Sequence, residues 1–140
     1  MKHWVLGICA LTMAAALPVA HAADEISPET VAGVTTIDTA KAKELFDKGV
    51  VFVDVRSTKD WDAGRIPGAE HMDNHKGAFT DEALSSALGG KDKEVVLYCN
   101  GHKCLRSSEA SVEAVKWGYK KVYYYRDGFP AWQGAGNPVE

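Results

Sequence analysis

Short apolar runs, rich in valine and tyrosine, alternate with longer amphipathic stretches along most of the chain. The three strongest runs cover 50–55, 95–98 and 122–125. Runs of this length and composition are typical of strands that are buried on both faces of a parallel sheet. Two weaker runs, at 33–37 and 69–72, indicate one further strand each.

The stretches between these strands predict three helices, over 39–48, 81–88 and 105–117. The first two helices have candidate N-caps and a glycine at the C-terminal end. Asp38 or Thr39 would cap the first helix, which ends before Gly49, and Thr80 or Asp81 would cap the second, which ends before Gly89. The third helix has an apolar stripe that we expect to face the core, formed by Leu105, Val112, Val115 and Tyr119. The alternation predicts one α/β domain over 34–140, a five-stranded parallel sheet with helices on both faces.

The first 22 residues differ from the rest of the chain. They carry a single charged residue, Lys2, then an apolar run over 4–20, and end in the small-x-small triplet of residues 20–22. This pattern predicts a secretory signal peptide over 1–22, cleaved after Ala22, and therefore a periplasmic or secreted protein. A membrane anchor is the less favoured alternative, because the run is short and interrupted for a span of about 20 residues. We expect no stable membrane insertion after cleavage.

The segment 23–33 has mixed polarity and contains Pro28, and we interpret it as a loosely held N-terminal arm. The whole chain has 140 residues and a net charge of −3. Loss of residues 1–22 leaves 118 residues and a net charge of −4. Such a chain has no basic field that would attract nucleic acid. Its content of 46% hydrophobic and 25% charged residues argues against disorder as the main state.

Three cysteines, Cys9, Cys99 and Cys104, are too few for a disulfide-framed miniprotein. Only Cys99 and Cys104 remain after cleavage, and in an oxidising compartment two thiols five positions apart can pair.

Cys99 directly follows the strand at 95–98 and precedes the helix predicted from Leu105. Ligands of parallel α/β sheets bind at the carboxyl ends of strands, so Cys99 is placed where chemistry usually occurs. The loop amides, the helix N-terminus and the cations His102, Lys103 and Arg106 all favour a thiolate over a thiol, whose pKa is ordinarily about 8.5. The alternative is an inert cysteine buried at a strand end.

Three segments of the chain resemble the rhodanese (sulfurtransferase) homology domain family. Residues 53–69 read VDVRSTKDWDAGRIPGA, similar to the family's DVR…GHIPGA, with Arg65 where histidine is commoner. The Cys99 loop with Arg106-Ser107 is the second segment. The third, over 127–139, is similar to the closing pattern GGxxxW…GxPV. Together the segments span nearly all of the chain after residue 33.

The resemblance implies a sulfurtransferase that needs no cofactor. Cys99 would form a persulfide with the sulfane sulfur of a small anionic donor such as thiosulfate and pass it to a thiol or cyanide acceptor. The loop residues that would hold the substrate are Asn100, Gly101, His102, Lys103, Cys104, Leu105 and Arg106. Lys103 and Arg106 would attract the anion. Asp54, Arg56 and Arg65 are interpreted as supporting residues that tie loops together.

Two features depart from the family pattern. Six residues separate Cys99 from Arg106, where four are commonest, and longer loops in the superfamily accompany larger oxyanions. Phosphatase or arsenate reductase activity ranks well below sulfur transfer, because the phosphatase pattern Cys-x5-Arg places its arginine where this chain has Leu105. Cys104 is the second departure. We interpret it as a possible resolving thiol, and hypothesise that a Cys99–Cys104 disulfide blocks sulfur transfer until it is reduced.

Other readings of the sequence remain open. The chain could be a non-catalytic rhodanese-like binding or sulfur-carrier module, or a thiol–disulfide redox protein that uses both cysteines. A metal site at His71, His75 and His102 is disfavoured, because such polar loops are commonly solvated, and no metal is expected.

Overall fold

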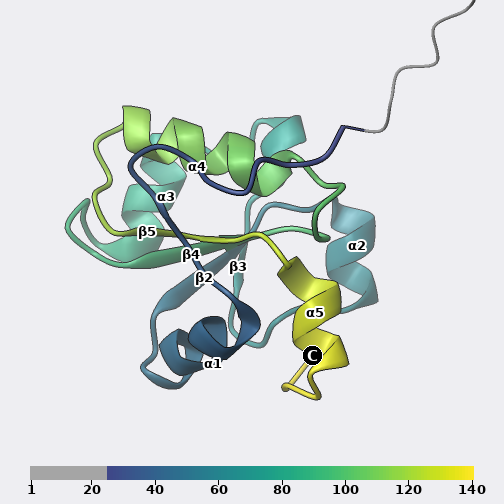
Figure 1. Cartoon of the computed structure of the whole chain (residues 1–140). Coiled ribbons are helices and arrows are strands. Elements are labelled where there is room, and N and C mark those ends of the chain that lie inside the picture. The colour runs from purple at the N-terminus through teal and green to yellow at the C-terminus, as the bar shows by residue number, and fades with distance from the viewer. Residues whose placement is uncertain (1–24) are drawn as a thin grey trace, which may run out of the picture.

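The computed structural model describes residues 25–140, and within them five parallel strands form one sheet in the order β1-β5-β4-β2-β3. The strands are β1 (Thr35–Thr36), β2 (Val51–Asp54), β3 (Glu70–His71), β4 (Val95–Tyr98) and β5 (Val122–Tyr125). All five lie where the apolar runs predict them, and the α/β fold class is confirmed (Figure 1). The predicted signal peptide, its cleavage after Ala22 and Cys9 lie outside the described residues.

Helices cover both faces of the sheet, as predicted (Figure 1). The core on one side contains Leu84 of α3 (Asp81–Leu88) and Ala114 of α4 (Arg106–Lys116). The core on the other side contains Leu45 of α1 (Thr39–Asp47) and Trp132 of α5 (Gly128–Gly134). Asp38 and Thr80 are the observed caps of α1 and α3. The sequence analysis did not predict α5, α2 (Thr58–Ala63) or the 3-10 turn η1 (Asn74–Lys76).

The predicted apolar stripe of the third helix is only partly right: Tyr119 is buried in the core, whereas Leu105 and Val115 are only partly buried. Val112, assigned to the core-facing stripe, is 40% exposed. The buried side chains of α4 are instead small, namely Ser107, Ser108, Ala110, Ser111 and Ala114. The Ser111 hydroxyl donates a hydrogen bond to the Ser107 carbonyl oxygen (2.7 Å), so that its polar atom is satisfied inside the core. Small residues let α4 lie close against β4 and β5.

The N-terminal arm is held more firmly than the sequence predicts. The Ser27 carbonyl oxygen accepts hydrogen bonds from the guanidinium of Arg126, and the Pro28 carbonyl oxygen accepts one from the Tyr124 hydroxyl (3.0 Å). The Ser27 amide donates to the carbonyl oxygen of His102 (2.7 Å), inside the cysteine loop. Backbone groups of the arm thus tie it both to the end of β5 and to the candidate site.

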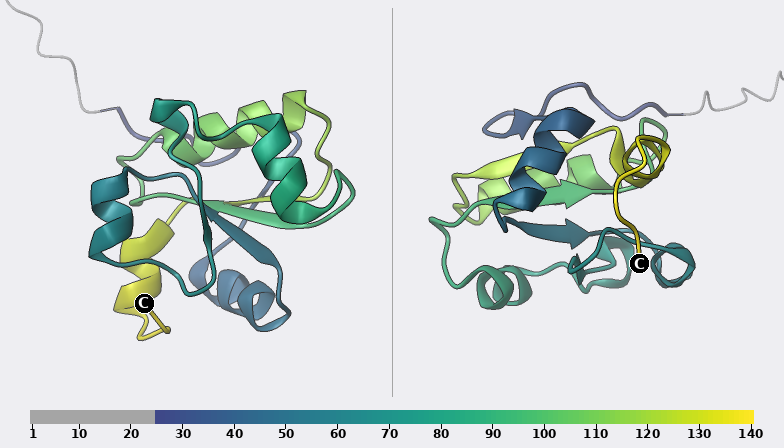
Figure 2. Two further views of the ribbon diagram at one scale, coloured as in Figure 1. Left: turned by 180° about the vertical axis from the view of Figure 1, so that it is seen from behind. Right: turned by 90° about the horizontal axis from the view of Figure 1, so that it is seen from below.

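The C-terminal residue is fixed beside the segment that follows α2 (Figure 2). The backbones of Arg65 and Glu140 exchange two hydrogen bonds of 3.0 Å, and Arg65 Nε donates to Glu140 Oε1 (3.0 Å). The Arg65 guanidinium also stacks over the Trp61 ring at 4.5 Å. The structure therefore shows Arg65 joining residue 140 to α2.

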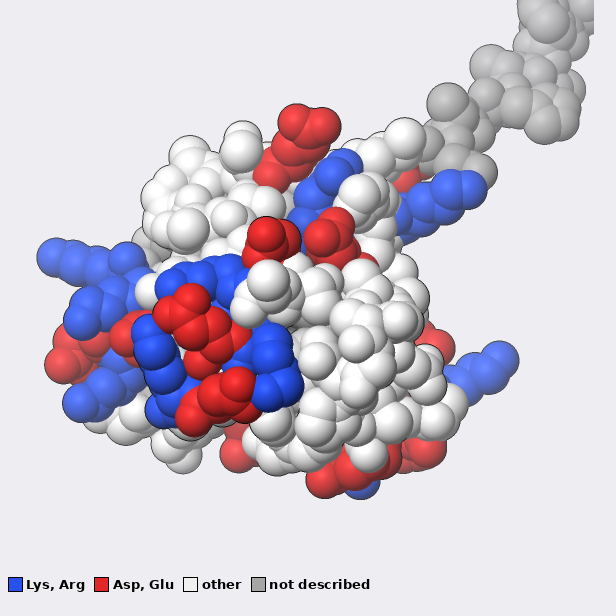
Figure 3. Space-filling view, turned by 60° about the horizontal axis from the view of Figure 1, so that its bottom comes forward, with Lys and Arg blue, Asp and Glu red and all other residues white. Residues whose placement is uncertain are grey.

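Charged side chains of both signs mix on the surface. On α1, Lys41 and Lys48 pair with Glu44, and Lys43 pairs with Asp47. On the face drawn in Figure 3, blue and red side chains are interspersed rather than separated into fields of one sign. Within residues 25–140, no helix has the length and apolar character needed to span a bilayer.

Candidate active site

Cys99 directly follows β4, the central strand of the sheet, and only 1% of its surface is exposed. Its carbonyl oxygen accepts a hydrogen bond from the amide of Phe129 (2.9 Å), in the first turn of α5. Gly128 approaches this carbonyl so closely that a Cβ atom at position 128 would overlap it and the amide of Gly101. The end of β4 is therefore packed directly against the start of α5.

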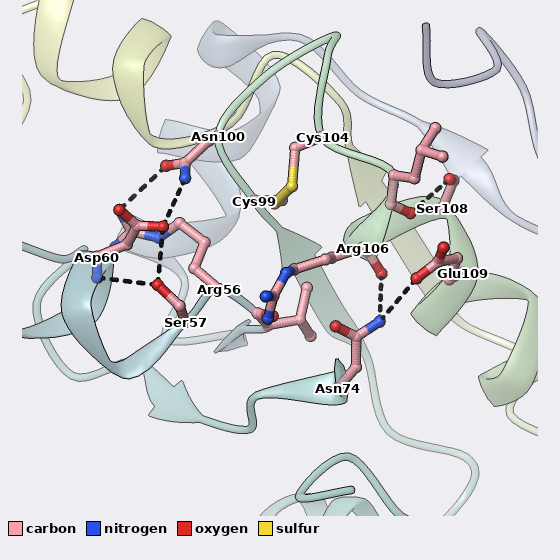
Figure 4. Close-up of a disulfide and its surroundings, with 12 residues drawn as sticks. Arg56, Ser57, Asp60, Asn74, Cys99, Asn100, Cys104, Arg106, Ser108 and Glu109 are labelled. Carbon is pink, nitrogen blue, oxygen red and sulfur yellow. Dashed lines mark hydrogen bonds between the residues drawn. A yellow bond between two sulfur atoms is a disulfide. The ribbon is translucent and has the colours of Figure 1, made fainter. Parts of the chain in front are cut away.

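Cys99 and Cys104 form a disulfide across the loop (Figure 4). Their Cα atoms are 6.2 Å apart, within the range usual for a disulfide. The Cys104 amide donates a hydrogen bond to the Gly101 carbonyl oxygen (3.0 Å), which closes a tight turn between the two cysteines. Cys104 is partly exposed, in contrast to Cys99.

Arg56 and Asp54 form a buried ion pair at the end of β2. Arg56 Nη2 donates to Asp54 Oδ2 (2.6 Å), and the Tyr98 hydroxyl donates to the same oxygen (2.7 Å). Burial opposes the charge of Arg56, but the hydrogen bond and charge of Asp54 outweigh it and raise the pKa of Arg56. Burial and the Asp54 carboxylate raise the pKa of Tyr98 far above its ordinary value. This hydrogen-bonded pair is a buried part of the scaffold beneath the cysteine loop.

Asn100 connects that ion pair to the cysteine loop. Its side-chain oxygen accepts a hydrogen bond from Arg56 Nη1 (3.3 Å), and its side-chain nitrogen donates to Asp60 Oδ2 (3.0 Å) (Figure 4). Asp60 belongs to the first turn of α2, where its amide donates to the capping hydroxyl of Ser57. The first residue after Cys99 is thus anchored to two other elements.

Arg106 begins α4 and contacts a different set of groups. Its Nη1 donates to Asp73 Oδ1 (2.5 Å) and to the carbonyl oxygen of Val55 (3.4 Å). Burial by itself raises the pKa of Asp73, but the hydrogen bond and charge of Arg106 outweigh it and hold that pKa below its ordinary value. Three buried oxygens around this pair, in Asp73, Asn74 and Ser107, accept or donate no hydrogen bond within the described part of the chain.

The remaining loop residues lie toward solvent. His102 Nε2 is 2.6 Å from Asp127 Oδ1, and the exposed fractions of the two side chains are 51% and 39%. Lys103 is exposed, whereas Leu105 is partly buried just before α4. The structure therefore brings Cys99, Cys104 and Arg106 together, and directs His102 toward the end of β5.

The three histidines considered for a metal site have separate partners. His71 Nε2 lies 2.9 Å from the Arg56 carbonyl oxygen, and its ring stacks on Trp61. His75 Nε2 lies 2.7 Å from Glu109 Oε2. Among residues 25–140, no three His, Cys, Asp or Glu side chains are grouped as metal ligands.

Asp73, Tyr98 and Gly128 also belong to the site, and the sequence patterns did not predict their place in it. Tyr98 was assigned to the strand core only, and its hydroxyl has no sequence signal. Asp73 pairs with Arg106 across 33 positions, which no local pattern predicts. Gly128 does occur in the quoted family motif, and its backbone φ of +68° is a conformation that favours glycine.

Comparison with known proteins identifies the domain. The sequence model of the family called Rhodanese-like domain matches residues 38–135. The thiosulfate sulfurtransferase GlpE of Pseudoalteromonas translucida is 33% identical over 101 residues, which cover 71% of this chain and 89% of that protein. An HTH-type transcriptional regulator of Mycobacterium tuberculosis is 30% identical over 122 residues, or 87% of this chain, but this chain spans only 50% of that regulator.

Among solved structures, a Rhodopseudomonas palustris protein of unknown function, called a possible tyrosine phosphatase, superposes with a TM-score of 0.65. It is 30% identical and the match covers 81% of this chain and 98% of that one. Relatives with this fold thus carry names from sulfur transfer, transcriptional regulation and phosphate chemistry, so that the fold by itself does not fix the activity. The family match covers most of the chain and includes the segments that surround Cys99, and the chain therefore belongs to the rhodanese-like domain family.

Proposed function

We propose that this protein is a sulfurtransferase that carries sulfane sulfur as a persulfide on Cys99. The observation that carries the proposal is the position of Cys99, at the carboxyl end of the central strand of a rhodanese-like domain and in front of the N-terminus of α4. The names of GlpE relatives support thiosulfate as a donor.

The transfer requires the reduced form of the loop. The Cys99 thiolate attacks the outer sulfur of thiosulfate, the S–S bond of the donor breaks, and sulfite leaves with the bonding electron pair. An acceptor thiolate then attacks the outer sulfur of the persulfide and restores the Cys99 thiolate. Burial of Cys99 alone disfavours a thiolate, so the helix N-terminus and the nearby Arg106 must compensate.

Arg106 is the cation that we expect to attract the donor anion. Its guanidinium is held by Asp73, and its side chain keeps 22% of its surface exposed. Guanidinium groups suit oxyanions because they offer several N–H donors in one plane. Arg56, in contrast, is almost completely buried by its protein partners.

Incubation of the reduced protein with thiosulfate tests this proposal. We expect one sulfite per Cys99 to be released, and Cys99→Ser to abolish the release. The matched variant Cys104→Ser keeps Cys99 and should add one sulfur atom to its mass. If Cys104→Ser neither gains sulfur nor releases sulfite with thiosulfate or with other sulfane donors, the proposal is wrong.

The disulfide favours a second candidate, a thiol–disulfide redox protein. Cys104→Ser separates the two activities, because transfer through Cys99 alone survives this change whereas redox cycling does not. A non-catalytic carrier is the third candidate. It would load one sulfur per molecule and show little turnover with small thiol acceptors, whereas the proposed enzyme turns over repeatedly.

We also propose that the protein is exported, with its active form beginning at Ala23. The basic start, apolar run and small-x-small triplet of residues 1–22 support this proposal. Cell fractionation followed by N-terminal sequencing tests it. Export predicts Ala23 as the first residue in the periplasmic or extracellular fraction, and full-length protein confined to the cytosol would contradict it.

A further inference from the structure

We propose that Cys104 is a built-in acceptor which converts the Cys99 persulfide into a disulfide and releases the transferred sulfur as sulfide. This inference rests on the proposed function, because it begins from the Cys99 persulfide. It assigns the chain a thiosulfate-reducing activity that depends on an external dithiol, rather than transfer of sulfane sulfur to that thiol.

The disulfide shows which sulfur atom Cys104 reaches. The bond joins Cys104 to Sγ of Cys99, which is the inner sulfur of a persulfide on that residue. Attack there by the Cys104 thiolate forms the S–S bond seen in the structure and breaks the bond to the outer sulfur. The outer sulfur takes the electron pair of the broken bond and the proton that the Cys104 thiol gives up, and leaves as hydrosulfide. The two cysteine sulfurs are thereby oxidised, and the sulfane sulfur is reduced to sulfide.

The loop backbone keeps the two sulfurs together after the disulfide opens. The Phe129 amide holds the carbonyl of Cys99, the Gly101–Cys104 hydrogen bond holds the turn, and the Ser27 amide holds the carbonyl of His102 between them. None of these bonds involves the sulfur atoms. A thiol fixed this close has a high effective concentration, so attack by Cys104 outcompetes an external thiol at ordinary concentrations.

The difference in exposure between the two cysteines determines which sulfur of the disulfide the reductant attacks. Cys99 lies in the core at 1% exposure, whereas Cys104 is partly exposed beside the exposed Lys103. A reducing thiolate therefore meets Sγ of Cys104, forms a mixed disulfide there, and expels the Cys99 thiolate as the leaving group. The second thiol of the reductant then releases Cys104. For each turnover, one thiosulfate and two thiols give one sulfite, one sulfide and one disulfide.

Single-turnover experiments on the full chain test the proposal. Every variant carries Cys9→Ser, so that only Cys99 and Cys104 contribute thiols. The protein is reduced, freed of reductant and mixed with thiosulfate, and sulfite, sulfide, free thiols and mass are measured. We expect the parent to release one sulfite and one sulfide and to lose both thiols, whereas Cys104→Ser releases sulfite only and retains the extra sulfur.

The outcomes separate the two proposals. Absence of sulfite from both proteins contradicts the Cys99 persulfide and, with it, this inference. Sulfite from both proteins, with the extra sulfur retained by the parent and no sulfide released, overturns the built-in acceptor and leaves sulfurtransferase activity standing.

A trapping experiment tests the direction of reduction. The oxidised parent is mixed with a thioredoxin-like dithiol protein whose resolving cysteine is replaced by serine, and the mixed disulfide is mapped by peptide mass analysis. We expect the probe on Cys104. A probe attached to Cys99, or no mixed disulfide under conditions in which a small dithiol opens the bond, would overturn this part of the cycle.

Discussion

Arg56 and Arg106 both lie next to the cysteine loop, but they approach it from different elements and have different surroundings (Figure 4). Arg56 follows β2, is 3% exposed in its side chain, and donates to Asp54, to Asn100 and to the carbonyl oxygen of Gly64. Its guanidinium also lies 4.5 Å from the centre of the Phe129 ring. Little of its hydrogen-bonding capacity is left for a ligand.

Arg106 keeps such capacity. Its side chain is 22% exposed, and its hydrogen bonds to Asp73 and to the Val55 carbonyl oxygen both come from Nη1. The other N–H groups of a guanidinium are suitable donors for an oxyanion. A charged residue beside a candidate nucleophile can bind a ligand only if its existing hydrogen-bond partners leave donors for it. We therefore assign Arg56 to the scaffold and Arg106 to the anion.

The largest expected effect is a difference in the free energy of unfolding between variants of the two arginines. Arg56→Met leaves the Asp54 carboxylate buried without its cation, and we expect a loss of about 3–5 kcal/mol in the free energy of unfolding. Arg106→Met also leaves a buried carboxylate, that of Asp73, but the guanidinium that it removes is 22% exposed, so we expect a smaller loss of about 1–2 kcal/mol. Urea denaturation of both variants, with the disulfide intact, measures this difference. Equal losses would contradict the assignment of Arg56, and not Arg106, to the scaffold.

The positions of the strands could be predicted because buried parallel strands leave long apolar runs in the sequence. The short helices could not. α2 and α5 have six and seven residues, too few for a helical period to emerge. The buried face of α4 could be predicted only in part, because large apolar residues such as Val112 do not mark it and serine and alanine line it.

For the candidate site, the sequence pointed to the cysteine loop, but not to Asp73 or Tyr98 nor to the contacts that hold the loop. The position of Cys99 followed from the strand before it, and pairing of the cysteines was a possibility that spacing allowed. The contacts of Asp73 with Arg106 and of Ser27 with His102 join distant segments through geometry that has no local signature. The arm was expected to be loose from its mixed polarity and Pro28, whereas its backbone hydrogen bonds depend on no residue type and leave no sequence signal.

The next effect concerns the contact of Gly128 with the end of β4, next to the Phe129 ring that Arg56 covers. Gly128→Ala introduces a Cβ atom against the Cys99 carbonyl oxygen and the Gly101 amide, and we expect a loss of about 2–3 kcal/mol from overpacking and backbone strain. Gly68 is a matched control, because its φ of +73° is similar and no atom lies within 4 Å of the added Cβ. Gly68→Ala should cost about 1 kcal/mol. Similar losses in thermal or urea denaturation would show that conformation alone, and not the contact, matters.

A third prediction sharpens the role of Arg106. Arg106→Met should lower kcat/KM for thiosulfate in the reduced protein by about tenfold to a hundredfold, as expected from loss of one hydrogen bond to a charged group. Arg106→Lys keeps the charge without the planar set of donors and should recover part of the loss. Steady-state rates with a thiol acceptor measure both. Unchanged kcat/KM in Arg106→Met would remove Arg106 from the binding site.

The smallest effect is a difference in pH dependence that tests whether Arg106 is paired with Asp73 in solution. The lowered pKa of Asp73 means that its carboxylate stabilises the folded state above its ordinary value of 3.8, and that this contribution is lost as the pH falls below that value through the folded pKa. Asp73→Asn removes the contribution, so its unfolding free energy should be lower than that of the parent at neutral pH and should converge with it in acid.

Asp81 is the control for this prediction, because its pKa is also lowered, by its exposed partner Lys91. Added salt should weaken the difference made by Asp81→Asn more than that made by Asp73→Asn, because exposed charges are screened and buried ones much less. If salt removes both differences equally, the Arg106 pair is as solvated as a surface pair, and Asp73 does not hold the guanidinium in place.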